Sequence, residues 1–540
     1  MQPGQTHEVV NQPPPFGARD LWRDDVALRQ ALEREGGGAF AAQVAAYGAL
    51  AGGELLALSH DAHRDRPRLR THDAAGRRID TVEFHPHYHR TMEAAIGHGV
   101  AGLSWARPEP GAHVARAALS YLHYQAEPGS SCPLTMTHAA VPVLAREPAL
   151  RPWADRVAAC RYDARDLPAA DKHGLTLGMG MTEKQGGSDV RANTTRATPL
   201  PGGDAYELRG HKWFFSAPMS DGFLVLAQAP AGLTCLLLPR RLPDGAPNGF
   251  RLMRLKDKLG DWSNASSEIE FDAALAWRVG EEGRGIATII EMVMLTRLDC
   301  MLGSAGLMRM ALSQALHHCR HRHVFGKALV EQPLMRNVLA DLAVEAEAAL
   351  ALSMRVARAV DASPRDPAEA AFARVATAIG KFWICKRAPA FVNEAQECLG
   401  GAGYVEESLL PRLYRQAPLN SIWEGSGNIQ CLDVLRALSR EPASLAALQE
   451  ELARAEGLDT DYDRALGRLP GALPRSHDES QARALVMRLA LQLQAATLLQ
   501  AGSPVAVTFC RSRLREGPSA VYGVLAEDTP FASLIERAAG

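Results

Sequence analysis

The spacing of hydrophobic and polar residues changes along the chain. From about residue 22 to 170, alanine and leucine recur at helical spacing, with a break at residues 36–38 (Gly-Gly-Gly). Between about 175 and 280, short apolar runs such as 223–227 lie between Gly, Pro and Asp turns, and residues 268–271 alternate polar and apolar. The first pattern predicts helices, and the second predicts a small β-barrel or sandwich.

Helical spacing returns from Gly283 to about 440, with long Ala/Leu/Met runs at 333–360 and 367–398. Runs of this length are typical of a helix bundle. The predicted fold class is therefore α+β, mainly α. We expect four domains: an N-terminal helical domain with an extended Pro-rich arm (1–175), a middle β-barrel (176–282), a helix bundle (283–440) and a C-terminal helical extension (441–540).

Composition narrows the function classes. A chain of 540 residues is too long for one hydrophobic core, and 47% hydrophobic with 22% charged residues is ordinary for a globular protein. A net charge of −2 produces no overall electrostatic field that would attract the protein to nucleic acid or to a membrane. The nine cysteines form no Cys-x-x-Cys pair, which argues against a disulfide framework or a metal site. With no leader and no long uncharged apolar run, we expect a cytoplasmic protein without a membrane partner.

The segment 181–190 (Met-Thr-Glu-Lys-Gln-Gly-Gly-Ser-Asp-Val) is the first candidate for ligand contact. Glycines allow close backbone approach and present N–H groups to anions, and Thr182 and Ser188 add hydroxyls. A polar turn between domains is the alternative. In the segment 210–216, three adjacent aromatics precede Ser216. Because successive strand residues point to opposite faces, at least one ring should face a planar partner or the core.

Two further segments carry Arg and Gly. Arg322 opens the run Arg-His-Val-Phe-Gly-Lys, in which an arginine suited to phosphate precedes a Phe-Gly turn. A solvated helix end is the alternative there. The Gly-rich break at 400–403 is not a dinucleotide fingerprint, because helical sequence precedes it.

A single acidic residue, Glu424, lies in the Gly-rich segment 422–430 (Ile-Trp-Glu-Gly-Ser-Gly-Asn-Ile-Gln). A carboxylate preceded by an aromatic and followed by small residues is a candidate general base at the edge of a cofactor pocket. A solvated loop glutamate is the alternative.

Together these segments resemble the acyl-CoA dehydrogenase family in order and spacing over about residues 30–440. The resemblance rests on the motifs Met-Thr-Glu-x-x-x-Gly-Ser-Asp, Lys-x-aromatic-x-Ser, Arg-x-x-Phe-Gly, Gly-Gly-x-Gly-Tyr and Trp-Glu-Gly-Ser. The runs MTEKQGGSDV, GHKWFFS, RLKDKLG and SIWEGSGNI are similar to the AidB branch of that family, the alkylation-response branch, and extend the resemblance to nearly the whole chain.

The resemblance implies FAD, held non-covalently between the β-domain and the helix bundle, and a homotetramer. It implies that Glu424 removes the α-proton of an acyl-CoA thioester while flavin N5 accepts the β-hydride. By position, the residues expected to bind the cofactor are Met181, Thr182, Gly187, Ser188, Asp189, Val190, Phe214, Phe215, Ser216, Arg322, Phe325, Trp423, Gly425, Ser426, Asn428 and Gln430. Arg322 would meet the diphosphate, and Asn428 and Gln430 the adenosine.

The chain departs from the family pattern at several positions. Trp423 replaces the usual Tyr and should narrow the acyl pocket. Pro333 replaces a Gln, with Gln332 one position early, and Glu397 replaces another Gln.

The AidB branch also implies binding of double-stranded DNA through the C-terminal extension. Residues 441–540 hold ten Arg against thirteen acids, or −3, but residues 475–515 hold six Arg against two acids, or +4. The expected phosphate contacts are Arg436, Arg475, Arg483, Arg488, Arg511, Arg513 and Arg515. A solvated helical surface is the alternative.

Two functions stay open at this point. The first is a flavoprotein of the alkylation response that binds DNA and has a weak or specialised dehydrogenase site. The second is a conventional dehydrogenase of a branched acyl-CoA, using Glu424 and FAD, without a DNA role.

Overall fold

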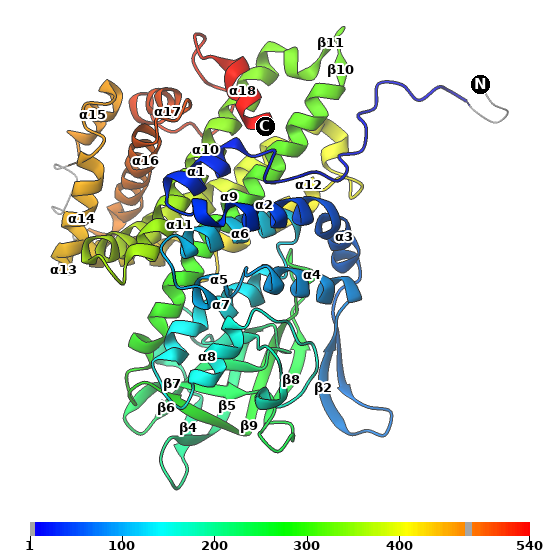
Figure 1. The fold of residues 1–540 in the computed structure, drawn as a ribbon, viewed down its shortest axis with the longest axis vertical. Coiled ribbons are helices and arrows are strands. Elements are labelled where there is room, and N and C mark those ends of the chain that lie inside the picture. Colours follow the sequence, from blue (N-terminus) through cyan, green and yellow to red (C-terminus); the bar gives the residue numbers. More distant parts are fainter. Residues whose placement is uncertain (1–5, 470–477) are drawn as a thin grey trace. The chain divides into compact units, whose positions relative to one another are not determined.

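The computed structural model describes residues 6–469 and 478–540. By their contacts they form two compact units, which are described separately below (Figure 1). One unit is continuous, Ala42–Asp299, and the other combines Met1–Ala41 with Cys300–Gly540. The first predicted domain is thus divided, because its N-terminal segment packs with the bundle and the C-terminal region.

The continuous unit begins with helices and a two-stranded hairpin. Helices α6 and α7 are buried along almost their whole length, and the buried Arg116 of α6 pairs with Asp299. The elements are α2 (Ala41–Leu50), η2 (Ala51–Leu55), α3 (Leu56–Arg64), β1 (Arg68–His72), β2 (Arg78–Glu83), α4 (Pro86–Gly97), α5 (Leu103–Ala106), α6 (Ala112–Ala126), α7 (Ser131–Ala145), α8 (Arg151–Ala158) and η3 (Ala169–Asp171).

A β-barrel follows. Its strands pair in the ring β6–β4–β5–β9–β7 and back to β6, while β3 joins β6 and β8 joins β9. Phe215, Phe223 and Phe250 meet in its core. The elements are β3 (Leu177–Gly180), η4 (Val190–Ala192), β4 (Arg196–Pro199), β5 (Ala205–Ser216), β6 (Gly222–Ala229), β7 (Gly232–Pro239), β8 (Phe250–Leu255) and β9 (Ser266–Val279).

The second unit is built on long helices joined by short turns. Its elements are α1 (Val26–Arg34), η1 (Gly38–Phe40), α9 (Gly285–His321, which begins in the continuous unit), β10 (His323–Val324), β11 (Lys327–Ala328), η5 (Leu329–Glu331), α10 (Pro333–Ala362), α11 (Pro367–Leu399), η6 (Gly400–Gly403), α12 (Leu410–Gln416), η7 (Leu419–Ser421), α13 (Gly427–Arg440), α14 (Pro442–Ala453), α15 (Thr460–Leu466), η8 (Glu479–Gln481), α16 (Ala482–Gln500), α17 (Ala506–Phe509), η9 (Cys510–Arg515) and α18 (Phe531–Ala539).

The C-terminal region is packed onto the bundle. Arg355 of α10 is buried and donates to Glu369 of α11 at 2.7 Å and to Glu451 of α14 at 2.8 Å. A buried charge needs such partners, so this ion-paired cluster fixes α14 against both bundle helices. The predicted fold class, mainly helical with a middle β-barrel, is confirmed.

One continuous helical stretch, Gly38–Arg64, has the length and hydropathy of a membrane span. Among the described residues it is the only such stretch, and 39% of its most apolar window is buried. Val44, Tyr47 and Leu55 on that stretch are buried in the protein core. A single helix of this kind is weak evidence for a membrane span, since core helices have the same composition.

Candidate active site

The segment 181–190 forms a tight turn after strand β3. The Glu183 N–H donates to Gly186 O at 2.8 Å, and the Gly186 N–H donates back to Glu183 O at 3.2 Å. The following residues, Gly187, Ser188 and Asp189, are exposed. The turn therefore presents backbone and a hydroxyl group to the surroundings, as expected for a ligand-contacting loop.

Neighbouring contacts fix this turn. The carbonyl of Met181 accepts from Asn193 Nδ2 at 2.8 Å, and the Trp213 N–H donates to Thr182 O at 2.9 Å. Asp189 accepts the Arg191 N–H at 3.2 Å, so its carboxylate caps the short helix η4 that begins at Val190. The Asp189 carboxylate therefore already has a hydrogen-bond partner within its own loop.

Two charged residues of these motifs are buried inside the barrel. Lys212 Nζ donates to Glu183 Oε1 at 2.8 Å and to Leu226 O at 2.7 Å. Burial alone would raise the pKa of Glu183, but the charge of Lys212 and hydrogen bonds from Lys212, Thr195 and Thr194 lower it to about 2. The pair joins the turn to strand β5 and faces away from solvent, so its role is to hold the two motifs together.

The adjacent aromatic residues of strand β5 point to opposite faces of the strand. Phe214 is 54% exposed and its ring lies 4.6 Å from Lys256 Nζ. Phe215 is fully buried in the barrel core, so the prediction that it contacts the cofactor is wrong. Ser216, two positions from Phe214, shares the outward face, with Oγ 3.1 Å from Ser266 Oγ. Phe214 and Ser216 therefore remain the candidates on this strand.

In the other unit, Glu424 lies on a strained turn. Its φ is +59°, an unusual value for a residue with a side chain, and Gly425 follows at +90°. Lys381 of α11 is buried and its Nζ donates to Trp423 O at 2.6 Å and to Gly425 O at 2.5 Å. Such strain persists only where the surroundings enforce it, and it concentrates at functional sites.

Gln430 braces the same turn. It is fully buried, and its Nε2 donates to Glu424 O at 3.0 Å and to Gly425 O at 2.8 Å. The expectation that Gln430 contacts adenosine is therefore corrected, because no part of its side chain reaches the surface. Glu424 itself is half-buried, and the next residues Ser426 and Asn428 are exposed at the start of α13.

Trp423 is fixed by its own hydrogen bond. The indole Nε1 donates to Asn420 Oδ1 at 3.0 Å, and Asn420 Nδ2 donates to Ser304 Oγ at 3.2 Å on α9. The ring beside Glu424 thus has a defined orientation.

Arg322 begins a hairpin held by the N-terminal arm. Arg322 Nη1 donates to Asn11 O at 2.6 Å, and the Asn11 side chain accepts the His323 N–H at 2.8 Å. Phe325 at the hairpin tip is 98% exposed. Gln332, one position before Pro333, donates to Val324 O at 2.9 Å and so stabilises the hairpin.

The Gly-rich turn η6 follows α11. Glu397, where a Gln was expected, is exposed and accepts from Asn393 Nδ2 at 2.9 Å, one helical turn earlier. Tyr404, just after the turn, is 84% exposed.

The arginines expected to contact DNA differ in availability. Arg513 is buried between Asp341 and Glu345, so the expectation that it contacts phosphate is wrong. Arg511 donates to Asp528 at 2.5 Å and Arg515 to Glu516 at 3.0 Å.

Three other arginines, Arg436, Arg483 and Arg488, are exposed. Arg483 Nη1 donates to Asn428 Oδ1 at 2.9 Å. The predicted contact at Arg475 lies outside the described residues.

Three family models match the chain in succession: the adaptive response protein AidB N-terminal domain over residues 11–164, the acyl-CoA dehydrogenase middle domain over 178–274, and the acyl-CoA dehydrogenase C-terminal domain over 283–439. The putative acyl-CoA dehydrogenase AidB of Escherichia coli is 49% identical over 94% of this chain and 95% of its own length. The chain belongs to the AidB branch of the acyl-CoA dehydrogenase family.

Solved structures share the fold of this chain. Caenorhabditis elegans ACDH-11, solved in complex with C11-CoA, superposes with a TM-score of 0.85 at 28% identity, covering 94% of this chain and 92% of that one. An acyl-CoA dehydrogenase of Bacillus anthracis complexed with FAD shares the fold, with a TM-score of 0.66 at 17% identity over 84% of this chain and 82% of that one.

FAD is the cofactor of the acyl-CoA dehydrogenase family. In this AidB-branch chain the barrel residues fit a planar, polar cofactor: an exposed ring at Phe214, an outward hydroxyl at Ser216 and an exposed backbone at Gly187. A Cβ at Gly187 would lie 3.3 Å from the Thr182 methyl group, so the absence of a side chain keeps this edge open.

Lys381 is the residue that the sequence reasoning missed. It lies in the run Ala-Ile-Gly-Lys-Phe-Trp-Ile, residues 378–384, as one charge among apolar and small residues of α11. A lone lysine on a buried helix needs acceptors, and that was the available signal. In this AidB-branch chain the acceptors are the carbonyls on either side of Glu424.

Proposed function

We propose that this chain is an FAD-containing, acyl-CoA dehydrogenase-like protein of the alkylation-damage response, with weak or specialised dehydrogenase activity. The observation that carries the enzymatic part is the position of Glu424. Its turn combines a positive φ with four hydrogen bonds from Lys381 and Gln430 to the surrounding carbonyls. A loop glutamate with a purely solvated role would have no need of this restraint.

Two groups of residues would hold the cofactor, each within its own unit. On the barrel they are Met181, Thr182, Gly187, Ser188, Val190, Phe214 and Ser216. On the helical unit they are Arg322, Phe325, Trp423, Gly425, Ser426 and Asn428. When bound, FAD supplies an acceptor for the hydride that leaves the β-carbon of the substrate.

The substrate class is an acyl-CoA thioester. The support is the C. elegans relative, whose structure holds C11-CoA, at 94% coverage of this chain. Glu424 would take the α-proton of the thioester onto its carboxylate. Trp423, locked by Asn420, would restrict the acyl chain beside that carboxylate, which is why we propose slow or selective turnover.

The enzymatic proposal is tested with purified, FAD-loaded protein. Acyl-CoA thioesters of graded length and branching are mixed with it in a stopped-flow instrument, and bleaching of the flavin absorbance is followed. We expect at least one thioester to bleach the flavin, and Glu424→Gln to slow bleaching at least about a hundredfold. Unchanged bleaching in Glu424→Gln would remove Glu424 as the base, and a colourless protein that binds no added FAD would overturn the cofactor assignment.

The alkylation-response part of the proposal includes binding of double-stranded DNA. Its support is the resemblance to AidB together with three exposed arginines, Arg436, Arg483 and Arg488, on α13 and α16. Contacts to phosphate alone would give sequence-independent binding, in which each contact adds about 0.9 to the slope of log affinity against log salt.

A salt-titrated DNA shift assay tests this proposal. The triple variant with Glu at 436, 483 and 488 should lose DNA binding and its salt dependence. Arg515→Glu, at an arginine already paired with Glu516, should change DNA binding little. Absence of any binding by the wild type at low salt would leave the conventional dehydrogenase as the better function.

We also propose a cytoplasmic homotetramer. The nine cysteines are all free thiols, which is typical of a reducing compartment. On the helical unit, Phe325 and Leu334 are 98% and 84% exposed, and large apolar side chains exposed to this degree mark protein contact sites when they gather in a patch.

A further inference from the structure

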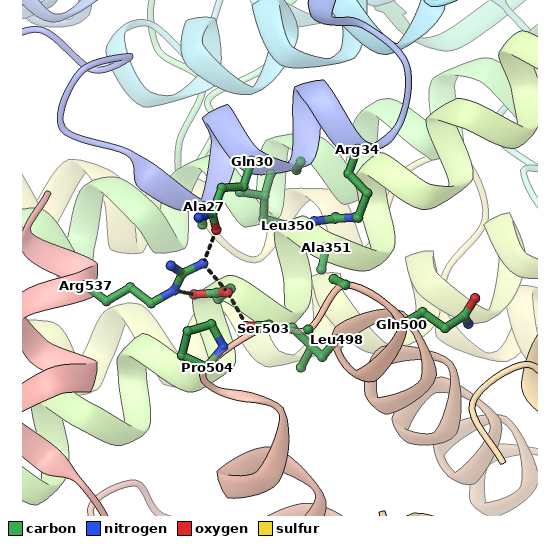
Figure 2. Close-up of a pocket in the computed structure, with 14 residues that line it drawn as sticks. Ala27, Gln30, Arg34, Leu350, Ala351, Leu498, Gln500, Ser503, Pro504 and Arg537 are labelled. Atoms are coloured by element: carbon green, nitrogen blue, oxygen red, sulfur yellow. Dashed lines mark hydrogen bonds and ion pairs between the residues drawn. The ribbon is translucent and has the colours of Figure 1, made fainter. Parts of the chain in front are cut away.

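The charged side chains at a cavity of about 450 Å³ in the helical unit are paired with one another (Figure 2). Arg537 of α18 donates to both carboxylate oxygens of Glu347, at 2.7 and 2.8 Å, and to Gln30 Oε1 at 2.7 Å. Arg34 of α1 donates to Glu35 Oε1 at 2.8 Å. The charges at this cavity are therefore balanced by neighbouring side chains.

A series of hydrogen bonds in the β-barrel differs from that network, because it ends at a group on the outer face of the barrel. It starts in the run 254–260 (Arg-Leu-Lys-Asp-Lys-Leu-Gly), which ends strand β8 and enters the loop before β9. Lys258 Nζ lies 3.2 Å from Ser266 Oγ, at the start of β9. Ser266 Oγ in turn lies 3.1 Å from Ser216 Oγ, because the two serines are cross-strand partners on β9 and β5.

The loop before β9 holds Lys258 in place. Lys258 Nζ also donates to Asp261 Oδ2 at 3.0 Å and to Asn264 O at 2.8 Å, so each of its three N–H groups has an acceptor. Asp261 is buried with a φ of +58°, and its Oδ2 also accepts from Asn264 Nδ2 at 3.2 Å. Trp262 Nε1 donates to Lys258 O at 2.9 Å. These contacts fix the position from which Lys258 reaches Ser266.

The chemistry of the three groups sets the direction of the hydrogen bonds. An ammonium group only donates, so Ser266 Oγ accepts from Lys258. Ser266 is 6% exposed, and a buried hydroxyl hydrogen needs an acceptor. Among the described residues, Ser216 Oγ is the acceptor within hydrogen-bond distance, so Ser266 donates to Ser216. The hydrogen of the Ser216 hydroxyl then points away from Ser266, and it is available on the face that Ser216 shares with Phe214.

We propose that Lys258 is a positioning residue for the cofactor, and that through Ser266 it holds the Ser216 hydroxyl as a hydrogen-bond donor to the flavin ring. The assignment rests on the proposed function, in which Ser216 contacts FAD. The ring nitrogens and carbonyl oxygens of an oxidised flavin accept hydrogen bonds, so a hydroxyl fixed as a donor matches them. The charge of Lys258 also polarises the hydrogen bonds that follow it in the series, which strengthens the last donor.

The affinity for FAD measures this effect. FAD-loaded protein is diluted in steps, and the fluorescence of the released FAD gives the dissociation constant. Ser216→Ala should weaken FAD binding about three- to tenfold, which corresponds to the loss of one hydrogen bond. Lys258→Met should weaken it at least about threefold, because the Ser216 hydroxyl can then donate back to Ser266. Arg251→Met removes a positive charge from an exposed position on β8 of the same barrel, and it should bind FAD as the wild type does.

A double-mutant cycle separates positioning from a general effect of the loop or of its charge. If Lys258 acts through Ser216, Lys258→Met should weaken FAD binding no further in a protein that already carries Ser216→Ala. Ser266→Ala leaves the other two acceptors of Lys258 in place and should weaken FAD binding as Lys258→Met does. It takes the place of Lys258→Met in the cycle if that variant does not fold.

Three results would overturn the role of Lys258. They are wild-type FAD affinity in Lys258→Met, wild-type FAD affinity in Ser216→Ala, and equal weakening by Lys258→Met with and without Ser216→Ala. Each of them leaves FAD and Glu424 in the proposed function unaffected, because the protein still binds the cofactor. A wild-type protein that binds no FAD would instead overturn the cofactor assignment and this inference together.

Discussion

Lys381 restrains the backbone around Glu424, the residue that we propose as the base. Its ammonium group holds the carbonyls on both sides of Glu424, and it does so from inside the helix bundle. Because a positive φ at Glu424 is intrinsically unfavourable, these donors stabilise the turn that carries its carboxylate.

We therefore predict that Lys381→Met slows flavin reduction by acyl-CoA about tenfold or more. The Trp423 carbonyl would lose its donor at a cost of about 1–3 kcal/mol, while Gly425 O keeps the bond from Gln430. The turn can relax to avoid that cost by moving Glu424. Stopped-flow bleaching measures the rate, and FAD content measures whether the cofactor site stays intact. Arg440→Met, at an exposed residue at the far end of α13, is the control; equal rates in both variants would show that Lys381 does not position the base.

The motifs could be recognised from the sequence, but the direction in which each side chain points could not be predicted from it. Phe214 and Phe215 are chemically alike, and only the pleat of β5 decides which ring enters the barrel core. Gln430 carries the same amide whether it contacts a ligand or a backbone carbonyl. For both residues the deciding partner is set by tertiary packing, which a single sequence does not display.

At the scale of elements, the Glu183–Lys212 pair joins a turn to a strand within the barrel. The folded protein holds the pKa of Glu183 at about 2, below the ordinary value of 4.5. A depressed carboxyl pKa contributes stability that is fully present above the ordinary value and is lost as the pH falls toward the folded value.

Acid should therefore weaken the barrel through this pair. Between about pH 4.5 and pH 2, the free energy of unfolding should fall more steeply in the wild type than in Glu183→Gln, which has no carboxyl group to protonate there. Urea unfolding followed by tryptophan fluorescence at several pH values measures the difference. Glu270→Gln, at an exposed position on β9, should follow the wild type; parallel curves for all three proteins would contradict the assigned role of the pair.

In η9, the sequence suggests a positive charge available to a ligand, but in the folded structure that charge is buried. Arg511, Arg513 and Arg515 form a basic run in the sequence, yet Arg513 lies between Asp341 and Glu345 of α10, more than 160 residues away. A charge count over a window cannot include acids so distant in the chain. Of the arginines in that count, Arg513 is unavailable to a phosphate because it is buried.

Arg513→Gln should consequently act on stability. Removing it takes the ion-pair partner from the buried carboxylate of Asp341 and one ion-pair partner from the buried carboxylate of Glu345. Breaking a buried ion pair typically lowers the free energy of unfolding by about 3–5 kcal/mol. Thermal unfolding measures the loss. Arg515→Gln, at an exposed residue of the same element, should change stability by no more than about 0.5 kcal/mol; a similar loss in both would mean that burial of Arg513 is not the cause.

At the scale of the whole molecule, the proposed tetramer can be tested at the exposed apolar residues of the helical unit. In light-scattering measurements coupled to gel filtration, we expect the wild type to have the mass of a tetramer. The double variant with Glu at 325 and 334 should run as a smaller species, because two charges would enter the proposed contact. Val507→Glu changes a lone exposed apolar residue on α17 and should leave the mass unchanged; a monomeric wild type would contradict the assembly.

The division of the chain into one continuous and one discontinuous unit has a consequence for biosynthesis. Residues Ala42–Asp299 are continuous in the sequence and form a compact unit, so this unit can fold before the rest of the chain is translated. Helix α1 is made first but packs on α10 and faces α18, whose residues emerge more than 300 and about 500 positions later. During that interval the apolar side of α1, including Leu28 and Leu32, lacks the surfaces of α10 and α18 that it packs against in the folded protein.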